Sequence, residues 1–340
     1  MCIIYALNNT VRDEIRRNLF MKPYLIDLND PNDCICKYVD FDRDRNFTKE
    51  HLDLLLTITG PNEIHEVTKS VFYKSNEISN HMQQSGFETM FVRDGDIEVT
   101  VRGRKCRVTA GDIMHFGCYN AHRMVWLEDT PWVGFFHNMN IHQPVADKML
   151  VNENYPDLTE AEIAEIYRES YDCYYLANPI ADNVPKLEIQ EIRPPEFAFA
   201  TFTFDGVEMR QKIGRWETNG IYEIWEFNME DGFRIDSGKP NPKASIYYVT
   251  EGSVHFKVFN NEFIAPKDSV VHIPAYATHS FQSTGKSVMY DTYSSTMYYD
   301  LICEWKSYEA YAPEKLEDKE FVESLKKKYN CYITEYNNKK

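Results

Sequence analysis

Short strand-like segments occur along most of the chain, and in some of them apolar and polar residues alternate. Alternation with a period of two sends successive side chains to opposite faces, and it predicts strands. The dipeptide Asp94-Gly95 lies between two such segments and predicts a tight hairpin. The pattern therefore predicts a protein built mainly of strands. These segments are residues 54–59, 64–73, 89–92, 97–102, 105–108, 113–116 and 221–227.

Two stretches have helical character instead. Thr159 and Glu162 have the spacing of a capping box, which predicts a helix from there to about Tyr171. Residues 318–329 predict a second short helix, with one apolar face and three lysines near its C-terminal end. Four prolines between residues 179 and 195 indicate an extended connector.

The chain also contains an internal repeat. The segment Tyr248–Gly252 resembles Phe91–Gly95, at an offset of 157 residues. The same offset relates His122 to His279, and no gap is needed. One constant offset over this length indicates two copies of the same structural unit.

Side chains suited to metal binding gather in the first copy. His81 and Gln83 are two residues apart, so on a strand they leave the same face. Glu88 follows after a short turn, and His122 returns from a later strand. Imidazole, amide oxygen and carboxylate together suit a divalent ion such as Mn, Fe, Co, Ni or Zn. We therefore predict one divalent metal ion per chain, bound by His81, Gln83, Glu88 and His122.

The spacing of these ligands resembles the first motif of the cupin superfamily. That motif usually reads Gly-x5-His-x-His-x3-4-Glu-x6-Gly. Here its core reads His81-x-Gln83-x4-Glu88-x6-Gly95. Gln83 replaces the second histidine, and this departure leaves the identity of the metal open.

A later segment resembles the second cupin motif, which usually opens with Gly-Asp and closes with Pro-x4-His. Here Gly111-Asp112 opens it and His122 closes it, with Gly117 in the place of proline. The resemblance covers roughly residues 65–140 and 220–300. It implies an all-β protein with two cupin barrels (double-stranded β-helices, or jelly rolls) in tandem and a few short helices.

The two copies differ in chemistry. An offset of 157 residues carries the first three ligands to Gly238, Pro240 and Ser245, and only His279 stays a possible ligand. We therefore expect a metal-free second barrel that serves packing and dimerisation.

Five regions follow from the resemblance and from the helical and proline-rich segments. The metal site belongs to the second of them and the degenerate site to the fourth. The regions are an N-terminal appendage (1–45), an N-terminal cupin barrel (46–145), a helical and extended linker (146–200), a C-terminal cupin barrel (201–300) and a C-terminal helical tail (301–340).

The composition and the net charge indicate which classes of partner and which cellular compartment to expect. The net charge of −16 over 340 residues argues against nucleic acid and anionic membranes, which need clustered Lys and Arg. No apolar run approaches the ~20 residues of a membrane span. The first residues lack the basic region of a signal peptide. Eight cysteines without a CxxC pair indicate reduced thiols. We therefore expect a cytoplasmic protein with a small-molecule substrate.

Four protein ligands would leave one or two coordination positions for water or substrate, as a catalytic metal requires. Glu88 would either bind the metal or act as a general base. Four residues near the predicted mouth are weaker candidates for the substrate pocket, with ordinary packing or surface exposure as the alternative. They are Arg123, Trp126, Phe87 and Met90.

The ligand pattern is similar to that of quercetinase-like cupins, and this similarity implies dioxygenase-type cleavage. We expect the substrate to be a small hydroxy-carbonyl, enediol or carboxylate metabolite. Two alternatives stay open. One is a non-redox isomerase, hydrolase or lyase that acts on a sugar acid or a 1,3-dicarbonyl. The other is a small-molecule-binding cupin without turnover. We also expect a homodimer, because cupins often pair through edge strands that would otherwise stay exposed.

Overall fold

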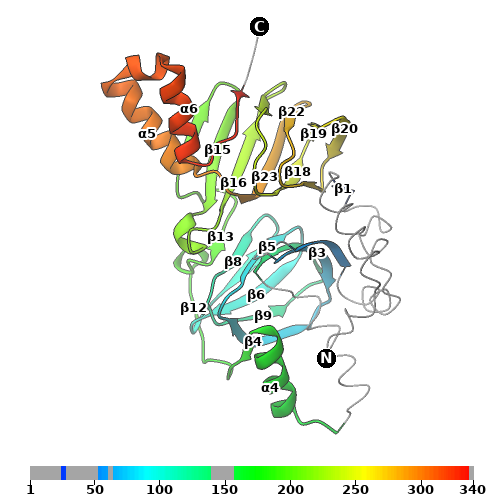
Figure 1. The fold of residues 1–340 in the computed structure, drawn as a ribbon. Helices are drawn as coiled ribbons and strands as arrows, with labels where there is room; N and C mark the ends of the chain where they lie inside the picture. Colours follow the sequence, from blue (N-terminus) through cyan, green and yellow to red (C-terminus); the bar gives the residue numbers. More distant parts are fainter. Residues whose placement is uncertain (1–23, 28–52, 60–63, 139–156, 337–340) are drawn as a thin grey trace. The chain divides into compact units, whose positions relative to one another are not determined.

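The computed structural model describes residues 24–27, 53–59, 64–138 and 157–336 (Figure 1). The chain divides into two compact units, which we call the first barrel (residues 32–197) and the second barrel (residues 198–340 with residues 1–31). Most of the predicted N-terminal appendage lies outside the described residues, as does the beginning of the predicted linker.

Two six-stranded sheets make up the described part of the first barrel. Their strand orders are β13-β8-β5-β10-β3-β2 and β11-β4-β9-β6-β7-β12. All pairs are antiparallel except β12 with β7. The strands are β2 (Asp53–Thr59), β3 (Ile64–Phe72), β4 (Glu77–Gln83), β5 (Phe87–Val92), β6 (Asp96–Val101), β7 (Arg104–Thr109), β8 (Ile113–Phe116), β9 (His122–Trp126), β10 (Thr130–His137), β11 (Cys173–Tyr175), β12 (Asp182–Asn183) and β13 (Ile192–Arg193).

The second barrel has a seven-stranded and a five-stranded sheet within its described residues. Their orders are β1-β21-β18-β23-β16-β15-β14 and β20-β19-β22-β17-β24. The strands are β1 (Tyr24–Asp27), β14 (Thr201–Phe204), β15 (Val207–Ile213), β16 (Glu223–Met229), β17 (Arg234–Ser237), β18 (Ser245–Glu251), β19 (Ser253–Val258), β20 (Asn261–Pro266), β21 (Ser269–Ile273), β22 (His279–Ser283), β23 (Ser287–Ser294) and β24 (Glu335–Tyr336).

Strand boundaries confirm the internal repeat. The strands β6, β7, β9 and β10 begin and end 157 residues before β19, β20, β22 and β23. The hairpin glycines also correspond. Gly95 has φ +84° and Gly252 has φ +68°, a backbone region that disfavours other residues. A side chain at Gly95 would also collide with Thr130, and one at Gly252 would collide with Lys286 and Ser287.

Each barrel has its own apolar core, built from every second residue of its strands. In β6, Ile97, Val99 and Val101 point inward and are at most 2% exposed. Trp126 and Met90 belong to the same core. Burial at a period of two is what alternating strands produce when one face covers the core.

Three α-helices occur among the described residues. The predicted capping box starts α4 (Glu160–Tyr171): Thr159 N donates to Glu162 Oε2 at 2.8 Å, and Glu162 N donates to Thr159 Oγ1. The predicted tail helix is α6 (Lys319–Lys328), capped by the Asp318 carboxylate. A further helix, α5 (Tyr298–Tyr311), precedes it. Short 3-10 turns lie at Lys186–Glu188, Arg215–Glu217 and Pro313–Glu317.

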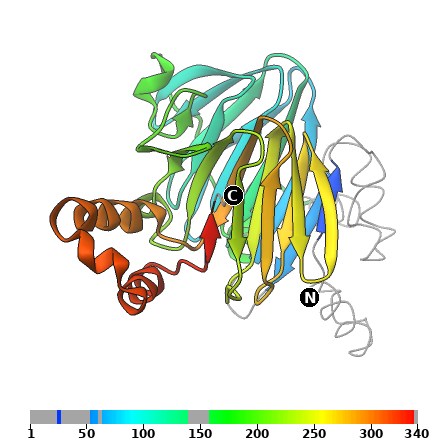
Figure 2. The same ribbon diagram turned by 90° about the horizontal axis from the view of Figure 1, so that it is seen from above.

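The prediction of an all-β fold with a few short helices is confirmed. Seen from above, α5 and α6 lie to one side of the strands of the second barrel (Figure 2). Among the helices that the structure describes, none has the length and apolar character that a membrane crossing would require.

Candidate metal centre

A β-bulge in β4 sets the position of His81. Ile78 pairs with Met124 and His81 pairs with His122, so β4 carries one more residue than β9 over this interval. Ile78 packs against the core, and the extra residue brings His81 rather than Asn80 opposite His122. Bulges redirect side chains in this way and often occur beside functional sites.

His81, Glu88 and His122 form a buried cluster inside the first barrel. Their possible ligand atoms all lie within 4.8 Å of one another. Glu88 Oε1 is 3.8 Å from His81 Nε2, and Glu88 Oε2 is 3.5 Å from His122 Nε2. All three residues are at most 5% exposed. The structure thus joins three of the four predicted ligands through donor atoms of the kind that bind divalent metals.

Both imidazoles are held by the backbone. His81 Nδ1 lies 2.9 Å from the carbonyl oxygen of Ser79, and His122 Nδ1 lies 2.9 Å from that of Asn120. A carbonyl oxygen can only accept, so each Nδ1 carries the proton. Each Nε2 of a neutral ring then presents its lone pair to Glu88. His122 Nε2 is buried and has no hydrogen-bond partner among the described residues. Backbone-held imidazoles of this kind are typical of metal ligands.

Gln83 completes the cluster. Its amide Nε2 donates to Glu88 Oε1 at 2.7 Å, so the amide orients the carboxylate. The amide oxygen of Gln83 takes no part in this hydrogen bond and is available to coordinate a metal ion. The ring of Phe116 stacks on His122, with 3.8 Å between ring centroids and 4° between ring planes. The amide thus contacts the carboxylate, and the stacked ring contacts the imidazole.

The charges of the cluster favour a bound cation. Burial acts to raise the pKa of Glu88, but the neighbouring imidazoles of His122 and His81 outweigh it and hold that pKa well below its usual value. Burial lowers the pKa of His122, and the neighbouring His81 lowers it further. The site therefore combines an ionised carboxylate with a neutral His122, and these are the states in which both groups bind metals.

Two of the predicted pocket residues, Arg123 and Phe87, face away from this cluster. Arg123 points away from the core on β9 and pairs with Glu77 at 2.8 Å. Trp126 and Met90 are core residues. Phe87 precedes Glu88, so its side chain leaves the opposite face of β5 and stacks with His115 at 6.3 Å.

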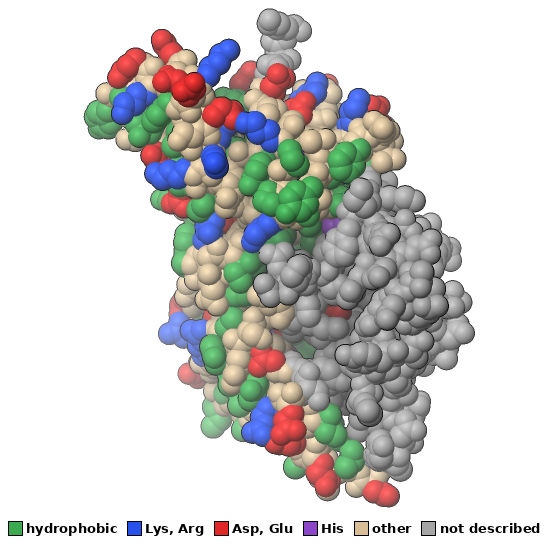
Figure 3. All heavy atoms as spheres, in the orientation of Figure 1, with side chains coloured by type: hydrophobic (Ala, Val, Ile, Leu, Met, Phe, Trp, Pro, Cys, Tyr) green, Lys and Arg blue, Asp and Glu red, His purple; other side chains and the backbone are tan. Residues whose placement is uncertain are grey.

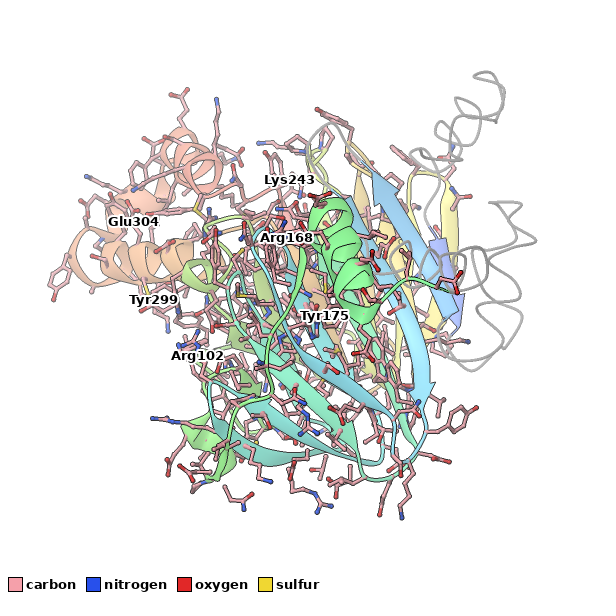
Figure 4. The ribbon with its side chains drawn as sticks, turned by 90° about the horizontal axis from the view of Figure 1, so that it is seen from below. Arg102, Arg168, Tyr175, Lys243, Tyr299 and Glu304 are labelled. Atoms are coloured by element: carbon pink, nitrogen blue, oxygen red, sulfur yellow. The ribbon has the colours of Figure 1, made fainter. Side chains whose placement is uncertain are left out.

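Sequence analysis missed the contribution of β11. Tyr175 pairs with His81 and Cys173 pairs with Gln83, so both side chains leave the sheet on the same face as the candidate ligands. The rings of Tyr175 and His81 are 6.2 Å apart, and Tyr175 is 41% exposed. Figure 4 shows Tyr175 close to helix α4. Burial and the Cys173 thiol raise the pKa of Tyr175 to about 12. β11 therefore adds a phenol and a thiol beside the cluster.

The comparisons with known proteins agree with this fold. Residues 70–136 match the family model described as "Cupin domain", and no curated protein matches the chain. The salicylate 1,2-dioxygenase of Pseudoaminobacter salicylatoxidans, solved as adducts with gentisate, shows 11% identity and a TM-score of 0.51. The match covers 79% of this chain and 80% of that one.

Two further solved structures are similar over much of the chain. An oxalate decarboxylase shows 14% identity and a TM-score of 0.45, with 72% of this chain and 73% of that chain covered. A cupin 2 conserved barrel domain protein from Leptotrichia buccalis shows 12% identity and a TM-score of 0.44, with 72% and 92% covered.

Residues 70–136, which hold all four predicted ligands, therefore form a cupin domain. Because the second barrel repeats the strands of the first, the chain as a whole has the fold of a bicupin, with two cupin barrels in tandem.

Proposed function

We propose that the first barrel is a metal-dependent enzyme site that binds one divalent ion through His81, Gln83, Glu88 and His122. The observation that carries this proposal is the buried cluster of three ligand side chains within 4.8 Å, with both imidazoles already oriented. The unpartnered Nε2 of His122 supports the same assignment, because a buried polar atom without a partner destabilises a fold unless something binds it.

Each residue then has a definite task. A bound divalent ion would act as a Lewis acid and would lower the pKa of a hydroxyl group on the substrate. His81 and His122 present their Nε2 atoms, and Glu88 supplies the only negative charge of the set. Gln83 orients Glu88. If Glu88 leaves the metal, its carboxylate becomes a general base within the site.

The favoured reaction is dioxygenase-type cleavage of a small hydroxy-carbonyl, enediol or carboxylate compound. In such a cleavage a carbon–carbon bond of the substrate breaks and both atoms of O2 enter the product, so no external reductant is required. The fold similarity to a dioxygenase solved with gentisate, which carries hydroxyl and carboxylate groups, supports this substrate class. Tyr175 is placed to contact such a compound beside His81.

Two other functions compete with this one. The same ligands suit a non-redox isomerase, hydrolase or lyase that acts on a sugar acid or a 1,3-dicarbonyl. A small-molecule-binding cupin without turnover would also keep them. Substrate turnover measured with and without O2 separates the three, because the first function needs O2, the second proceeds anaerobically, and the third shows no turnover in either condition.

The first experiment is elemental analysis of the purified protein. We expect about one Mn, Fe, Co, Ni or Zn per chain, lost in His81→Ala and kept in His279→Ala, the matched histidine of the second barrel. The metal-loaded protein is then screened in an oxygen electrode against small hydroxy acids and enediols. Stoichiometric metal in His81→Ala would disprove the site, while metal binding without turnover would leave the binding protein as the function.

The proposal also includes the cellular compartment and the oligomeric state of the protein. We expect a cytoplasmic protein that forms homodimers through edge strands of its sheets. A monomer mass at micromolar concentration, measured by sedimentation or light scattering, would contradict the dimer.

A further inference from the structure

The segment that follows α4 lies along β4, the strand that carries two of the candidate ligands. We call residues 172–178 the strap. Its centre is β11, which pairs with β4 so that Cys173 lies opposite Gln83 and Tyr175 lies opposite His81. The strap is attached to β4 at both ends, and the two ligands of β4 lie between these attachments.

Asp172 attaches one end of the strap to the turn between β4 and β5. Its carboxylate Oδ2 accepts hydrogen bonds from Gln84 N at 3.0 Å, from Ser85 N at 2.8 Å and from Ser85 Oγ at 2.6 Å. This turn connects the strand of two candidate ligands to the strand of Glu88. One carboxylate oxygen therefore holds the turn across which the ligands of β4 and Glu88 approach each other.

Asn80 attaches the other end of the strap. Its side-chain Nδ2 donates to Ala177 O at 2.8 Å, its N–H donates to Asn178 Oδ1 at 3.1 Å, and its carbonyl oxygen accepts from Leu176 N at 2.8 Å. Asn80 is buried and lies in the β4 bulge that brings His81 to its place in the cluster. The strap therefore holds the bulge through three hydrogen bonds to one residue.

The strap and α4 have little burial to hold them. Residues 172–174 are half-buried and residues 175–178 are exposed. No side chain of α4 that the structure describes is buried, and Figure 3 shows charged side chains of both signs where α4 lies in Figure 1. The two attachments and the pairing of β11 with β4 therefore keep the strap in place.

We propose that Asn80 and Asp172 are positioning residues of the metal centre. Asn80 keeps the bulge that orients His81, and Asp172 keeps the turn that brings Glu88 to the ligands of β4. Neither residue binds the metal itself. Loss of a partner that orients a metal ligand typically lowers metal affinity by about 10–100-fold. The inference rests on the proposed function, because it concerns the same metal centre.

The test is a titration of the full chain with Co²⁺, after a chelator has removed other metals. The visible absorption of Co²⁺ depends on the number and arrangement of its ligands. Asp172→Gly removes the carboxylate without strain, because Asp172 has φ +56° and glycine adopts this conformation readily. We expect this variant to bind Co²⁺ roughly tenfold more weakly than the parent protein, with a changed spectrum.

Two further variants at aspartates separate hydrogen bonding from charge. Asp172→Asn keeps an acceptor oxygen but not the charge, so it should restore most of the affinity and the parent spectrum. Asp182→Ala is the matched control, because Asp182 is an exposed aspartate of β12, which pairs with β7 and not with β4. It should bind Co²⁺ like the parent protein.

Asn80→Ala tests the other attachment and should also weaken Co²⁺ binding roughly tenfold, because the bulge loses its side-chain bond to Ala177. Amide hydrogen exchange gives a readout that needs no metal. In metal-free Asp172→Gly the N–H groups of Gln84 and Ser85 should exchange faster, while those of β6 should exchange as in the parent protein.

Two outcomes would overturn the positioning role and leave the metal site intact. The first is a parent protein that binds Co²⁺ and variants, Asp172→Gly and Asn80→Ala, with the same affinity and spectrum. The second is an equal loss in Asp172→Asn and Asp172→Gly, since charge rather than hydrogen bonding would then act on the metal. A parent protein that binds no Co²⁺ would instead contradict the proposed function, so the two failures are distinguishable.

Discussion

The two barrels hold a corresponding histidine in the same way but surround it differently. His122 and His279 both begin a strand, and both have Nδ1 next to the carbonyl oxygen two residues earlier, at 2.9 Å and 3.4 Å. His122 Nε2 faces the Glu88 carboxylate at 3.5 Å, whereas His279 Nε2 faces the hydroxyl of Tyr247 at 3.3 Å. The shared backbone therefore orients the imidazole, and the opposite side chain decides whether a metal can bind.

The buried acids of the two barrels extend this contrast. Burial acts to raise the pKa of Glu88, but the neighbouring imidazoles of His122 and His81 keep it low. Asp291 in the second barrel is equally buried, but no imidazole is among its partners. Burial raises its pKa to about 7, against the hydrogen bonds from Ser294 and the Tyr293 N–H. The first barrel thus keeps an anion that a cation can bind, while the second retains a proton.

The largest expected effect tests whether metal binding is confined to the first barrel. His122→Ala removes one of the three clustered donors, so the metal affinity should fall by more than the 10–100-fold typical of losing an outer partner. His279→Ala should leave the metal affinity unchanged. Both variants are titrated with metal under the same conditions, with circular dichroism to check folding. Equal losses in the two variants would mean that the barrels do not differ in the way described.

The second prediction concerns the proton on Asp291. Its folded-state pKa is raised from 3.8 to about 7, so its contribution to stability is fully present below about pH 4 and is lost as the pH rises through 7. Between about pH 5 and pH 7 this loss amounts to about 2 kcal/mol, because the slope of 1.36 kcal/mol per unit falls as the pH approaches the folded-state pKa. In Asp291→Asn the free energy of unfolding should change less over this interval, as denaturant titration at several pH values would show. A pH dependence identical to that of the parent protein would contradict the raised pKa.

A third prediction concerns the amide that orients Glu88. Gln83→Ala removes the 2.7 Å hydrogen bond to Glu88 and a possible ligand oxygen. We expect the metal affinity to fall by about 10–100-fold, as for other partners that orient a metal ligand. Metal titration of Gln83→Ala beside Gln84→Ala, whose exposed side chain lies outside the cluster, measures the effect. An unchanged affinity in Gln83→Ala would remove Gln83 from both roles.

Periodicity predicted the strands, spacing predicted the cluster of ligands, and the resemblance to cupins implied the two barrels. Strand alternation comes from burial at a period of two. The constant offset of 157 residues comes from the internal repeat, and the strand boundaries follow it. The ligands were predictable because charged and polar residues such as His and Glu seldom occupy core-facing strand positions unless they have a partner. His81, Glu88 and His122 meet as that spacing implies.

Other features depend on tertiary structure and left no such signal. The bulge in β4 is a difference in pairing between two strands, which the order of residues in β4 alone does not reveal. The strand β11 is only three residues long and owes its place beside His81 to pairing with β4. Helix α5 has no strong apolar periodicity, because it contacts the barrel on one face and α6 on another.

The smallest expected effect returns to the histidine of the second barrel. Tyr247 lies 157 residues after Met90, so Tyr247→Met gives the second barrel the residue of the first. The variant removes the hydroxyl that faces His279 Nε2 and leaves that buried nitrogen without a partner. We expect a loss of about 1–2 kcal/mol in the free energy of unfolding, which denaturant titration would measure. No metal should bind, because Ser245 stands in the place of Glu88.

Met90→Leu, an apolar change at the corresponding position, is the control and should lower the free energy of unfolding by less than about 1.5 kcal/mol. If Tyr247→Met were as stable as the parent protein, the hydroxyl would not be what satisfies His279. If it acquired a metal, a free imidazole alone would be enough, and the carboxylate would not be what separates the two barrels.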